Sequence, residues 1–402
     1  MSSAGGQEDS TATGGNRRID ELHQVPNSSN EVVLESGPYL PSDAVMGILS
    51  KLPAKTLFRF KSVCTNWDAM VPSNPHLVST HLRNYTRTSL LCTYRDLGNG
   101  GGGGEVPKSV LLHPDDNVDD SPRPIDWDDQ LLDEAICGAG NGLILLGSPY
   151  RHHNPNYRLL NLATGQIRLL PNPSPGLKER RSDFPDHCGV GLDLAADDVK
   201  VVVIRSGARS HRDPPTTVFV YTWRSNLWRK LAPGSHSCGV VGTFTPAFDC
   251  HLHSNGFFYW LFSNDWKSGD SYVMAFDMSN DILHRIDCPL SGLGSLGGTS
   301  RGGGDSVALI PLYMDSADDM WLLSRDDDGG GAWCWIKQHS TGRHFPTTLV
   351  VRGLWKDDRI MTDLDDQLVL YDTVNHKYRV LVDKPPGRLH VYRERLSLSI
   401  AK

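Results

Sequence analysis

The sequence predicts a multidomain α+β chain in which a small all-α domain precedes a large all-β domain. Two observations support this division. Helical periodicity is confined to residues 37–82, and strand–turn–strand segments recur along residues 88–400. The 39 Gly and 25 Pro among 402 residues also favour turns over long helices.

The first 36 residues are rich in Gly, Ser, Thr and Asn and contain few large apolar side chains. Such a segment cannot offset the entropy lost on ordering, so we expect residues 1–36 to form a disordered tail. It has no apolar stretch typical of a signal peptide, and no run of 18 apolar residues occurs in the chain. We therefore expect a cytoplasmic or nuclear protein with no membrane partner.

Charge and cysteine usage restrict the function classes further. Forty basic against 47 acidic residues give a net charge of −7, which does not favour a nucleic-acid partner. The eight cysteines contain no C-x-x-C pair, so we expect reduced and mostly buried thiols.

Two short helical patterns make up the predicted all-α domain. Ser42 is a candidate N-cap, followed by a stripe of Val45, Ile48, Leu49 and Leu52 that ends at Pro53. A second apolar series follows this proline, at Leu57, Phe60, Cys64, Trp67 and Val71.

A helical domain of roughly 40 residues is at or below the size that stabilises itself without a disulfide, a metal or a partner. A protein partner is therefore implied, and packing of these helices on the following domain remains the alternative.

The segment from Leu40 to His81 resembles the F-box, whose pattern of Leu-Pro-x-Asp, Ile-Leu, Leu-Pro-x-Lys, Arg-Phe, Val-Cys and Trp it follows without a gap. It departs from that pattern at Ala44, Thr56 and Thr65. The resemblance implies docking on a Skp1-like adaptor, and through it on cullin and RING subunits. The implied adaptor-binding residues are Leu40, Pro41, Ile48, Leu49, Leu52, Pro53, Leu57, Phe60, Val63, Cys64 and Trp67. Four basic residues against Asp43 and Asp68 leave a local charge of +2, which suits an acidic adaptor.

Four eleven-residue segments align without gaps in the predicted all-β domain and read as strand, polar turn and strand. They begin at Leu160, Tyr221, Phe276 and Tyr371, and a degenerate copy is expected over residues 321–336. Positions eight and eleven are apolar in all four, so we expect apolar groups on both strand faces. A hairpin repeat of about 50 residues predicts a propeller-like domain of about six blades.

This part of the chain also resembles the F-box-associated domain of plant F-box proteins. The resemblance rests on residues 138–143, 161–164 and 189–193, and on a C-terminal segment, residues 390–400, that would complete the first blade.

Other motifs do not predict a site. Gly298–Gly302 spells G-x-S-x-G without the flanking strand and helix of a nucleophile elbow, and Gly98–Gly104 lacks the Lys-Ser/Thr that grips a nucleotide. His251 with His253, and His236 with Cys238, supply too few ligands for a metal, and no cofactor is predicted. A basic strip at Arg205, Arg209, His211 and Arg212 is interpreted as a solvated loop.

Two functional hypotheses remain. In the favoured one, the protein performs no chemistry and is the substrate-recognition subunit of an SCF-type (Skp1–cullin–F-box) ubiquitin ligase, with an unknown target protein on the propeller. In the alternative, the propeller is an enzyme or a small-molecule sensor and the F-box is regulatory, or the chain binds the adaptor outside a ligase.

Overall fold

The structure is a computed structural model, and it describes a defined set of residues between 40 and 393. These are residues 40–65, 67–68, 71, 74, 76–77, 80–81, 88–96, 106–112, 123–125, 135–140, 142–147, 156–173, 186–193, 195–196, 198–205, 217–232, 243–244, 251–263, 270–291, 294–299, 306–311, 320–326, 331–338, 350–355, 359–384 and 386–393. The predicted tail, residues 1–36, lies outside them. Contact density divides the chain into two units, residues 1–42 and 43–402, and every strand belongs to the second.

The helical region contains α1 (Ser42–Leu49) and α2 (Ala54–Phe60). The sequence predicted that the first helix reaches Leu52, but α1 ends at Leu49 and a tighter turn follows, in which Leu52 N–H donates to the Leu49 carbonyl at 3.1 Å. Pro53 does not simply end a helix; it is the N-cap of α2, with an extended ψ of 139°. Ser42 is the first residue of α1 instead of its cap. Among the described residues, no helix has the length and apolar character needed to cross a membrane.

The described strands form five sheets, and neighbouring strands pair antiparallel except for β17 with β21. The first sheet has the order β25-β1-β2-β3, with bounds β1 Thr88–Asp96, β2 Val106–Leu112, β3 Arg123–Pro124 and β25 Pro386–Arg393. The second contains β4 Ala135–Gly140, β5 Leu143–Gly147, β6 Arg158–Asn161 and β7 Gln166–Leu169. The third contains β8 His187–Asp193, β9 Asp198–Arg205, β10 Thr217–Thr222 and β11 Leu227–Lys230. The fourth contains β12 Thr243–Phe244, β13 His251–Ser254, β14 Phe257–Ser263, β15 Asp270–Asp277 and β16 Ile282–Ser291.

The fifth sheet has eight strands and joins two meanders. One meander is β17 Gly294–Thr299, β18 Ser306–Pro311, β19 Met320–Arg325 and β20 Trp333–Gln338. The other is β21 Val350–Trp355, β22 Arg359–Leu364, β23 Gln367–Asp372 and β24 Lys377–Val382. A single parallel pair, Gly298 with Trp355, connects β17 to β21.

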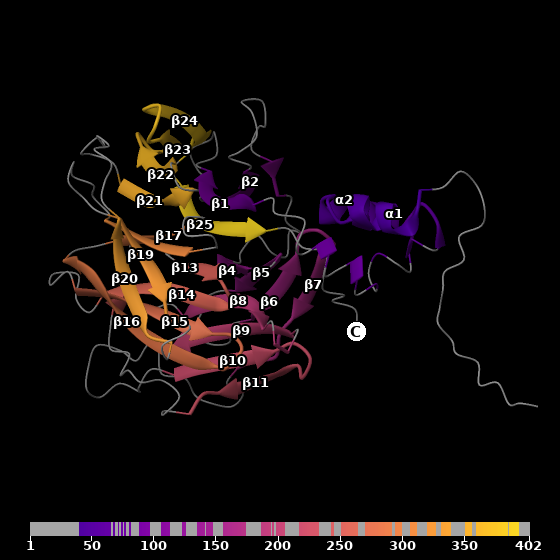
Figure 1. The fold of residues 1–402 in the computed structure, drawn as a ribbon, viewed down its shortest axis with the longest axis horizontal. Coiled ribbons are helices and arrows are strands. Elements are labelled where there is room, and N and C mark those ends of the chain that lie inside the picture. Colours follow the sequence, from indigo (N-terminus) through magenta and orange to yellow (C-terminus); the bar gives the residue numbers. More distant parts are fainter. Residues whose placement is uncertain are drawn as a thin grey trace, which may run out of the picture. The chain divides into compact units, whose positions relative to one another are not determined.

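The sheets have a propeller-like arrangement, as the sequence predicted (Figure 1). Four of them are single meanders with the form of one blade each, whereas the fifth combines two meanders in one hydrogen-bonded sheet. Hydrogen bonding alone therefore does not fix the expected number of about six blades.

Apolar clusters between the meanders build the core. Leu145 and Tyr157 of the second sheet pack with Val201 and Tyr221 of the third, and similar clusters connect each following pair of meanders. The series returns to the first sheet, which packs on β21–β24 on one side and on β4–β6 on the other. Both faces of the inner strands are consequently buried, which agrees with their nearly continuous apolar sequences.

The predicted hairpin repeats are confirmed. The four aligned segments are β6–β7, β10–β11, β15–β16 and β23–β24, and the degenerate copy over 321–336 is β19–β20. Position eleven is buried in all four: Leu170, Leu231, Ile286 and Leu381. Position eight is not uniformly buried, because Ile167 and Tyr378 are exposed at outermost strands. These two strands therefore carry apolar groups on both faces, as the sequence predicted, but the group at position eight is not packed against a neighbouring sheet.

A shared turn explains why the segments align. Their sixth residue has a positive φ in each copy, at Gly165, Asn226, Asp281 and His376. In three of them an Asn or Asp side chain at position two accepts backbone N–H groups two and three residues later, at Asn161, Asp277 and Asp372. Asx turns of this kind, followed by a left-handed residue, reverse the chain without leaving amides unpaired.

The C-terminal strand completes the first sheet, as the sequence predicted. β25 pairs antiparallel with β1 along a register that includes Leu90 with Val391 and Leu91 with His390. Tyr392 is buried and donates its hydroxyl to the Gly142 carbonyl at 3.3 Å, which fastens this strand to the second sheet. The rest of the predicted ending, residues 394–400, lies outside the described residues.

Candidate functional site

The helical region divides the predicted adaptor-binding residues into two groups. Leu49 and Leu57 are buried, while Leu52, Pro53, Phe60 and Trp67 are half-buried. The exposed group is Leu40, Pro41, Ile48, Val63 and Cys64. The sequence motif did not distinguish these groups, because the same apolar residue types serve both.

The buried group builds the local core. Leu49 and Leu57 cluster with Val71 and Leu77, and the half-buried rings of Phe60 and Trp67 meet at 5.2 Å between centroids. His81, also buried, lies with its Nε2 2.9 Å from the Leu52 carbonyl, in the segment that follows α1. These side chains hold the helices in place.

The exposed group offers an apolar surface. Ile48 is 52% exposed and Val63 is 63% exposed, although both are large apolar side chains. Ala44, which departs from the F-box pattern, is exposed four residues before Ile48 and thus lies on the same face of α1. Leu40, at 57% exposure, precedes the helix. Large apolar groups left in water near a small core are typical of a docking surface.

Basic side chains accompany this apolar surface. Lys51, Lys55 and Arg59 are exposed. Lys61 instead forms an ion pair with Asp68 at 3.3 Å and lies over the Phe58 ring, 5.8 Å from its centroid. The pair cancels one basic and one acidic charge, so the remaining excess of the segment is positive, as the sequence predicted. This charge would steer an acidic partner to the helices.

Comparison with known proteins identifies this segment. The family model of the F-box domain matches residues 38–75. Residues 38–75 are an F-box domain. The match covers the exposed residues just described, from Leu40 to Cys64.

Most of the chain also aligns with F-box proteins. An F-box protein of Arabidopsis thaliana is 27% identical over 300 residues, which cover 72% of this chain and 75% of the relative. An F-box/kelch-repeat protein of the same plant is 23% identical and is aligned over 84% of this chain and 89% of its own length. Among solved structures, a chain of a nidogen/laminin complex superimposes with a TM-score of 0.41 at 10% identity, covering 77% of this chain and 99% of that chain.

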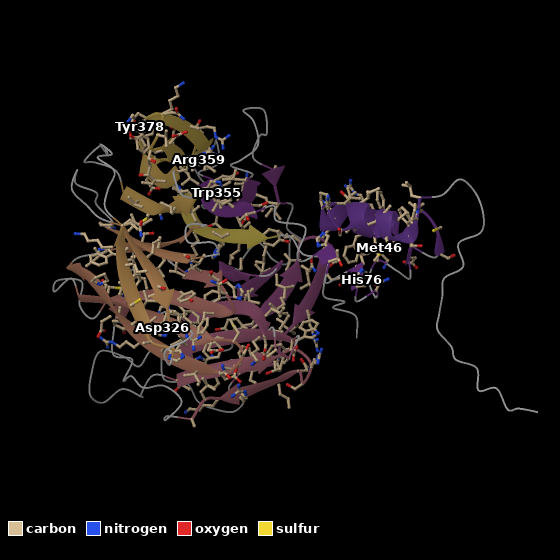
Figure 2. The ribbon with its side chains drawn as sticks, in the orientation of Figure 1. Met46, His76, Asp326, Trp355, Arg359 and Tyr378 are labelled. Atoms are coloured by element: carbon tan, nitrogen blue, oxygen red, sulfur yellow. The ribbon has the colours of Figure 1, made fainter. Side chains whose placement is uncertain are left out.

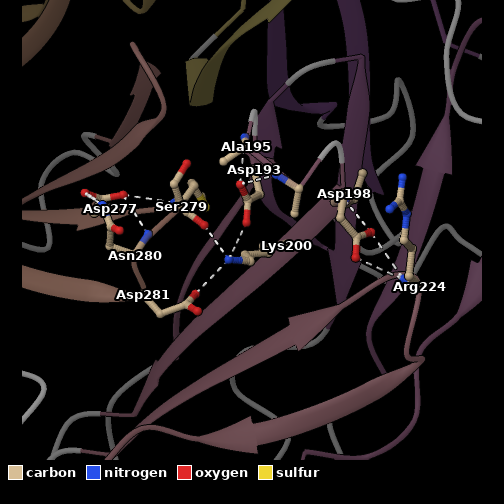
Figure 3. Close-up of polar contacts among 12 residues, drawn as sticks. Asp193, Ala195, Asp198, Lys200, Arg224, Asp277, Ser279, Asn280 and Asp281 are labelled. Carbon is tan, nitrogen blue, oxygen red and sulfur yellow. Dashed lines mark hydrogen bonds and ion pairs between the residues drawn. The ribbon is translucent and has the colours of Figure 1, made fainter. Parts of the chain in front are cut away.

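The β domain contains a buried ionic cluster that joins the third and fourth sheets (Figure 3). The Lys200 ammonium contacts Asp193 at 2.7 Å, Asp281 at 3.0 Å and the Met278 carbonyl at 2.5 Å. Lys200 and Asp193 are both buried. Burial raises the pKa of Asp193, but the hydrogen bond and charge of Lys200 and the Ala196 amide outweigh it, so the pKa is lowered. The charges are mutually satisfied, which indicates a connection between sheets and not a reactive site.

The six described cysteines have free thiols, and these thiols differ in burial. Cys92, Cys137 and Cys188 are buried and Cys288 is half-buried, but Cys64 and Cys334 are exposed. Desolvation raises the pKa of Cys92 and of Cys288 to about 12, which disfavours the nucleophilic thiolate. Cys238 and Cys250 lie outside the described residues.

Two histidines of the pattern weighed as a metal site lie on β13. His251 and His253 stand opposite Trp260 and Phe258 of β14 in the strand register. A Cβ on Gly191 would lie 2.6 Å from the His253 ring, so the imidazole fills the space that this glycine leaves. Among the described residues, no group of three or more His, Cys, Asp or Glu side chains is placed to hold a metal. His236 lies outside them.

Other sequence motifs are only partly described. Gly298 and Thr299 end β17, while Ser300–Gly302 and Gly98–Gly104 lie outside the described residues. Arg205 is the one described member of the basic strip, and its Nε donates to Asp186 at 3.2 Å. The sequence did not predict an aromatic cluster around Trp333; only the degenerate repeat at 321–336 marked that position.

Proposed function

We propose that this protein is the substrate-recognition subunit of an SCF-type E3 ubiquitin ligase. The observation that carries the proposal is the F-box match at residues 38–75, on a segment whose Ile48 and Val63 are exposed to solvent. F-box proteins among its relatives over most of the chain support the same role. In this proposal the F-box binds a Skp1-like adaptor, which connects the protein to cullin and RING subunits.

The mechanism needs no chemistry on this chain. The F-box fixes one end of the protein to the ligase, and the β domain holds a target protein. Tethering raises the effective concentration of target lysines near the ubiquitin-loaded enzyme, which accelerates transfer without a new catalytic group. In this proposal, ubiquitin transfer to the target takes place in the cytoplasm or nucleus.

The β domain is, in our proposal, a closed propeller of six blades. The two meanders of the eight-stranded sheet count as separate blades because an apolar cluster that includes Ala308, Leu354 and Ile360 packs between them, as clusters do between the other sheets. The pairing of β25 with β1 supports closure of the ring. A closed ring presents turns on two faces, where targets can bind.

Co-purification tests the proposal. The full chain is co-expressed with a Skp1-like adaptor, a cullin and a RING subunit, beside a Leu40→Ala, Pro41→Ala double variant. We expect a stoichiometric complex with the intact chain and its loss in the variant, because both replaced side chains are exposed and do not support the fold. A folded chain that binds no such adaptor would refute the ligase role.

A further inference from the structure

An aromatic and basic cluster lies where the β13–β16 sheet packs on the β17–β20 meander. Arg325 ends β19, and its guanidinium lies 5.1 Å from the Phe257 ring centroid and 5.4 Å from that of Trp333. Phe257 and Trp333 meet edge to face at 5.2 Å, and His284 lies 6.2 Å from Trp333. Figure 2 labels Asp326, the residue that follows Arg325 in the chain, and so indicates where this cluster lies.

Three nitrogens of this cluster are buried without a hydrogen-bond partner among the described residues. They are Arg325 Nε, Trp333 Nε1 and His284 Nε2. An unsatisfied buried polar atom destabilises the fold, and native proteins retain few of them. Three in one cluster of contacting side chains therefore indicate that an acceptor belongs there.

Other arginines of the domain show which acceptor is suitable. Arg285 also stacks on an aromatic ring, 4.0 Å from the Tyr272 centroid, and its Nε donates to Asp287 at 2.9 Å. Arg205 lies 5.2 Å from the Phe219 centroid and its Nε donates to Asp186 at 3.2 Å. In these two cases a carboxylate completes the stacked guanidinium group. Arg325 has the same aromatic contacts without this carboxylate.

The other described tryptophans with a recorded indole bond lead to the same conclusion. Trp228, Trp260 and Trp335 each donate Nε1–H to a backbone carbonyl, at 2.6, 3.2 and 2.9 Å. Trp335 is two residues beyond Trp333 in the same strand, so strand position does not prevent an indole from being paired. Nε of Arg and Nε1 of Trp are donors only, so the missing partner is an acceptor.

We propose that Arg325, Trp333 and His284 form a binding site for a carboxylate attached to a ring or another apolar group. The carboxylate oxygens would accept from Arg325 Nε and Trp333 Nε1, and the apolar part would pack beside Phe257 and Tyr259. Tyr259 is buried and its ring lies 6.2 Å from that of Trp333. The carboxylate could belong to a free small acid or to a target polypeptide. The site is independent of adaptor docking by the F-box.

Charged groups around the cluster are compatible with this ligand. Asp277 is an acid whose charge acts on His284. Its oxygens accept hydrogen bonds from the Ser279 and Asn280 amides and from the Asn280 side chain within its own turn. Burial lowers the pKa of His284, so its ring is neutral at pH 7 and Nε2 carries a proton in one tautomer. Arg325, Trp333 and His284 are each half-buried as residues, although the three unpaired nitrogens themselves are covered.

Calorimetric titration of the full chain with four probes tests the site. Benzoate represents a free acid and benzamide is its neutral control, whereas N-acetylphenylalanine represents a polypeptide C-terminus and its amide is the control. We expect both acids to bind, with a dissociation constant on the order of 1 mM for such small ligands, and both amides to bind at least about tenfold more weakly. Whichever acid binds more tightly identifies the source of the carboxylate.

Matched variants locate the binding. Arg325→Lys should weaken benzoate binding about tenfold, since the planar donor is lost, and Arg285→Lys should leave it unchanged. Trp333→Phe should weaken binding and Trp335→Phe should not, and in ¹⁵N-labelled protein benzoate should shift the indole signal that Trp333→Phe removes. Equal binding of acids and amides, no binding by the folded chain, or equal effects of Arg325→Lys and Arg285→Lys would each overturn the proposal.

Discussion

Ile48 and Leu57 lie in successive helices and have opposite environments. Leu57 is fully buried in the helical core, whereas Ile48 is 52% exposed. Burial of a leucine side chain stabilises a fold by roughly 1.5–3 kcal/mol, while an exposed isoleucine contributes little. The two positions therefore separate the core of the F-box from its exposed apolar surface.

Replacing each residue with alanine should separate these two effects. We expect Leu57→Ala to lower the free energy of unfolding by about 2–5 kcal/mol, because it leaves a cavity among buried side chains. Ile48→Ala should change it by no more than about 0.5 kcal/mol. Urea unfolding followed by circular dichroism measures both, and equal losses would show that Ile48 also supports the fold.

The buried lysine should be among the most sensitive charged residues of the β domain. Lys200→Met leaves Asp193 buried without its counter-charge, so we expect a loss of about 3–5 kcal/mol in the free energy of unfolding. Lys377→Met, at an exposed position, is the control and should be nearly neutral. A neutral Lys200→Met would show that the ion cluster is dispensable.

The same cluster predicts a pH dependence. The pKa of Asp193 is lowered in the folded state, so the unfolded chain takes up this proton first as the pH falls. The stabilisation from Asp193 is thus complete above its ordinary pKa of 3.8 and is lost as the pH falls through the lower folded value. Between pH 5 and pH 3, Asp193→Asn should lose less stability than the unaltered chain in urea titrations, and an identical loss would contradict the assignment.

At the scale of the element, tight hairpins depend on residues in left-handed conformations. β13 and β14 are joined by Asn255 and Gly256, which have φ values of 49° and 78°. Two consecutive positive φ angles define the type I′ turn, which matches the twist of the strands it connects. The Asn-Gly pair is the preferred sequence for it.

Glycine substitutions test this turn. A Cβ on Gly256 would have no atom within 4 Å, so Gly256→Ala adds strain without a clash and should cost about 1–2 kcal/mol. Gly47→Ala in α1 is the matched control, because its surroundings are equally open and alanine favours a helix by about 1 kcal/mol. Thermal unfolding should therefore move in opposite directions in the two variants; parallel shifts would contradict the assigned conformations.

The hairpins were largely predictable from sequence because their turn chemistry is local. Asp277 and Asp372 occupy the same place in aligned segments and accept the same amides. Burial at position eight was not predictable, since Leu283 on β16 packs in a cluster with the third sheet while Tyr378 on β24 is exposed, although both strands are outermost in their sheets. Likewise, the Arg325 cluster combines four strands, and pairwise spacing in one sequence does not reveal such contacts.

At the scale of the whole molecule, strands distant in the chain hold the β domain together. The Arg352 guanidinium binds Asp363 at 2.6 Å and also donates to the carbonyl of Pro386 in β25 at 3.3 Å. The β21–β22 hairpin is thereby fastened to the strand that completes the first sheet.

Affinity for a purified Skp1-like adaptor, measured by calorimetry on the full chain, tests the central claim most directly. Ile48→Asp places a charge on the exposed apolar surface of the F-box, and Ile167→Asp makes the same change at an exposed isoleucine of β7. We expect Ile48→Asp to weaken adaptor binding at least about tenfold, or about 1.4 kcal/mol, and Ile167→Asp to leave it unchanged. Equal affinities of the two variants and the unaltered chain would contradict the assignment of this surface to the adaptor.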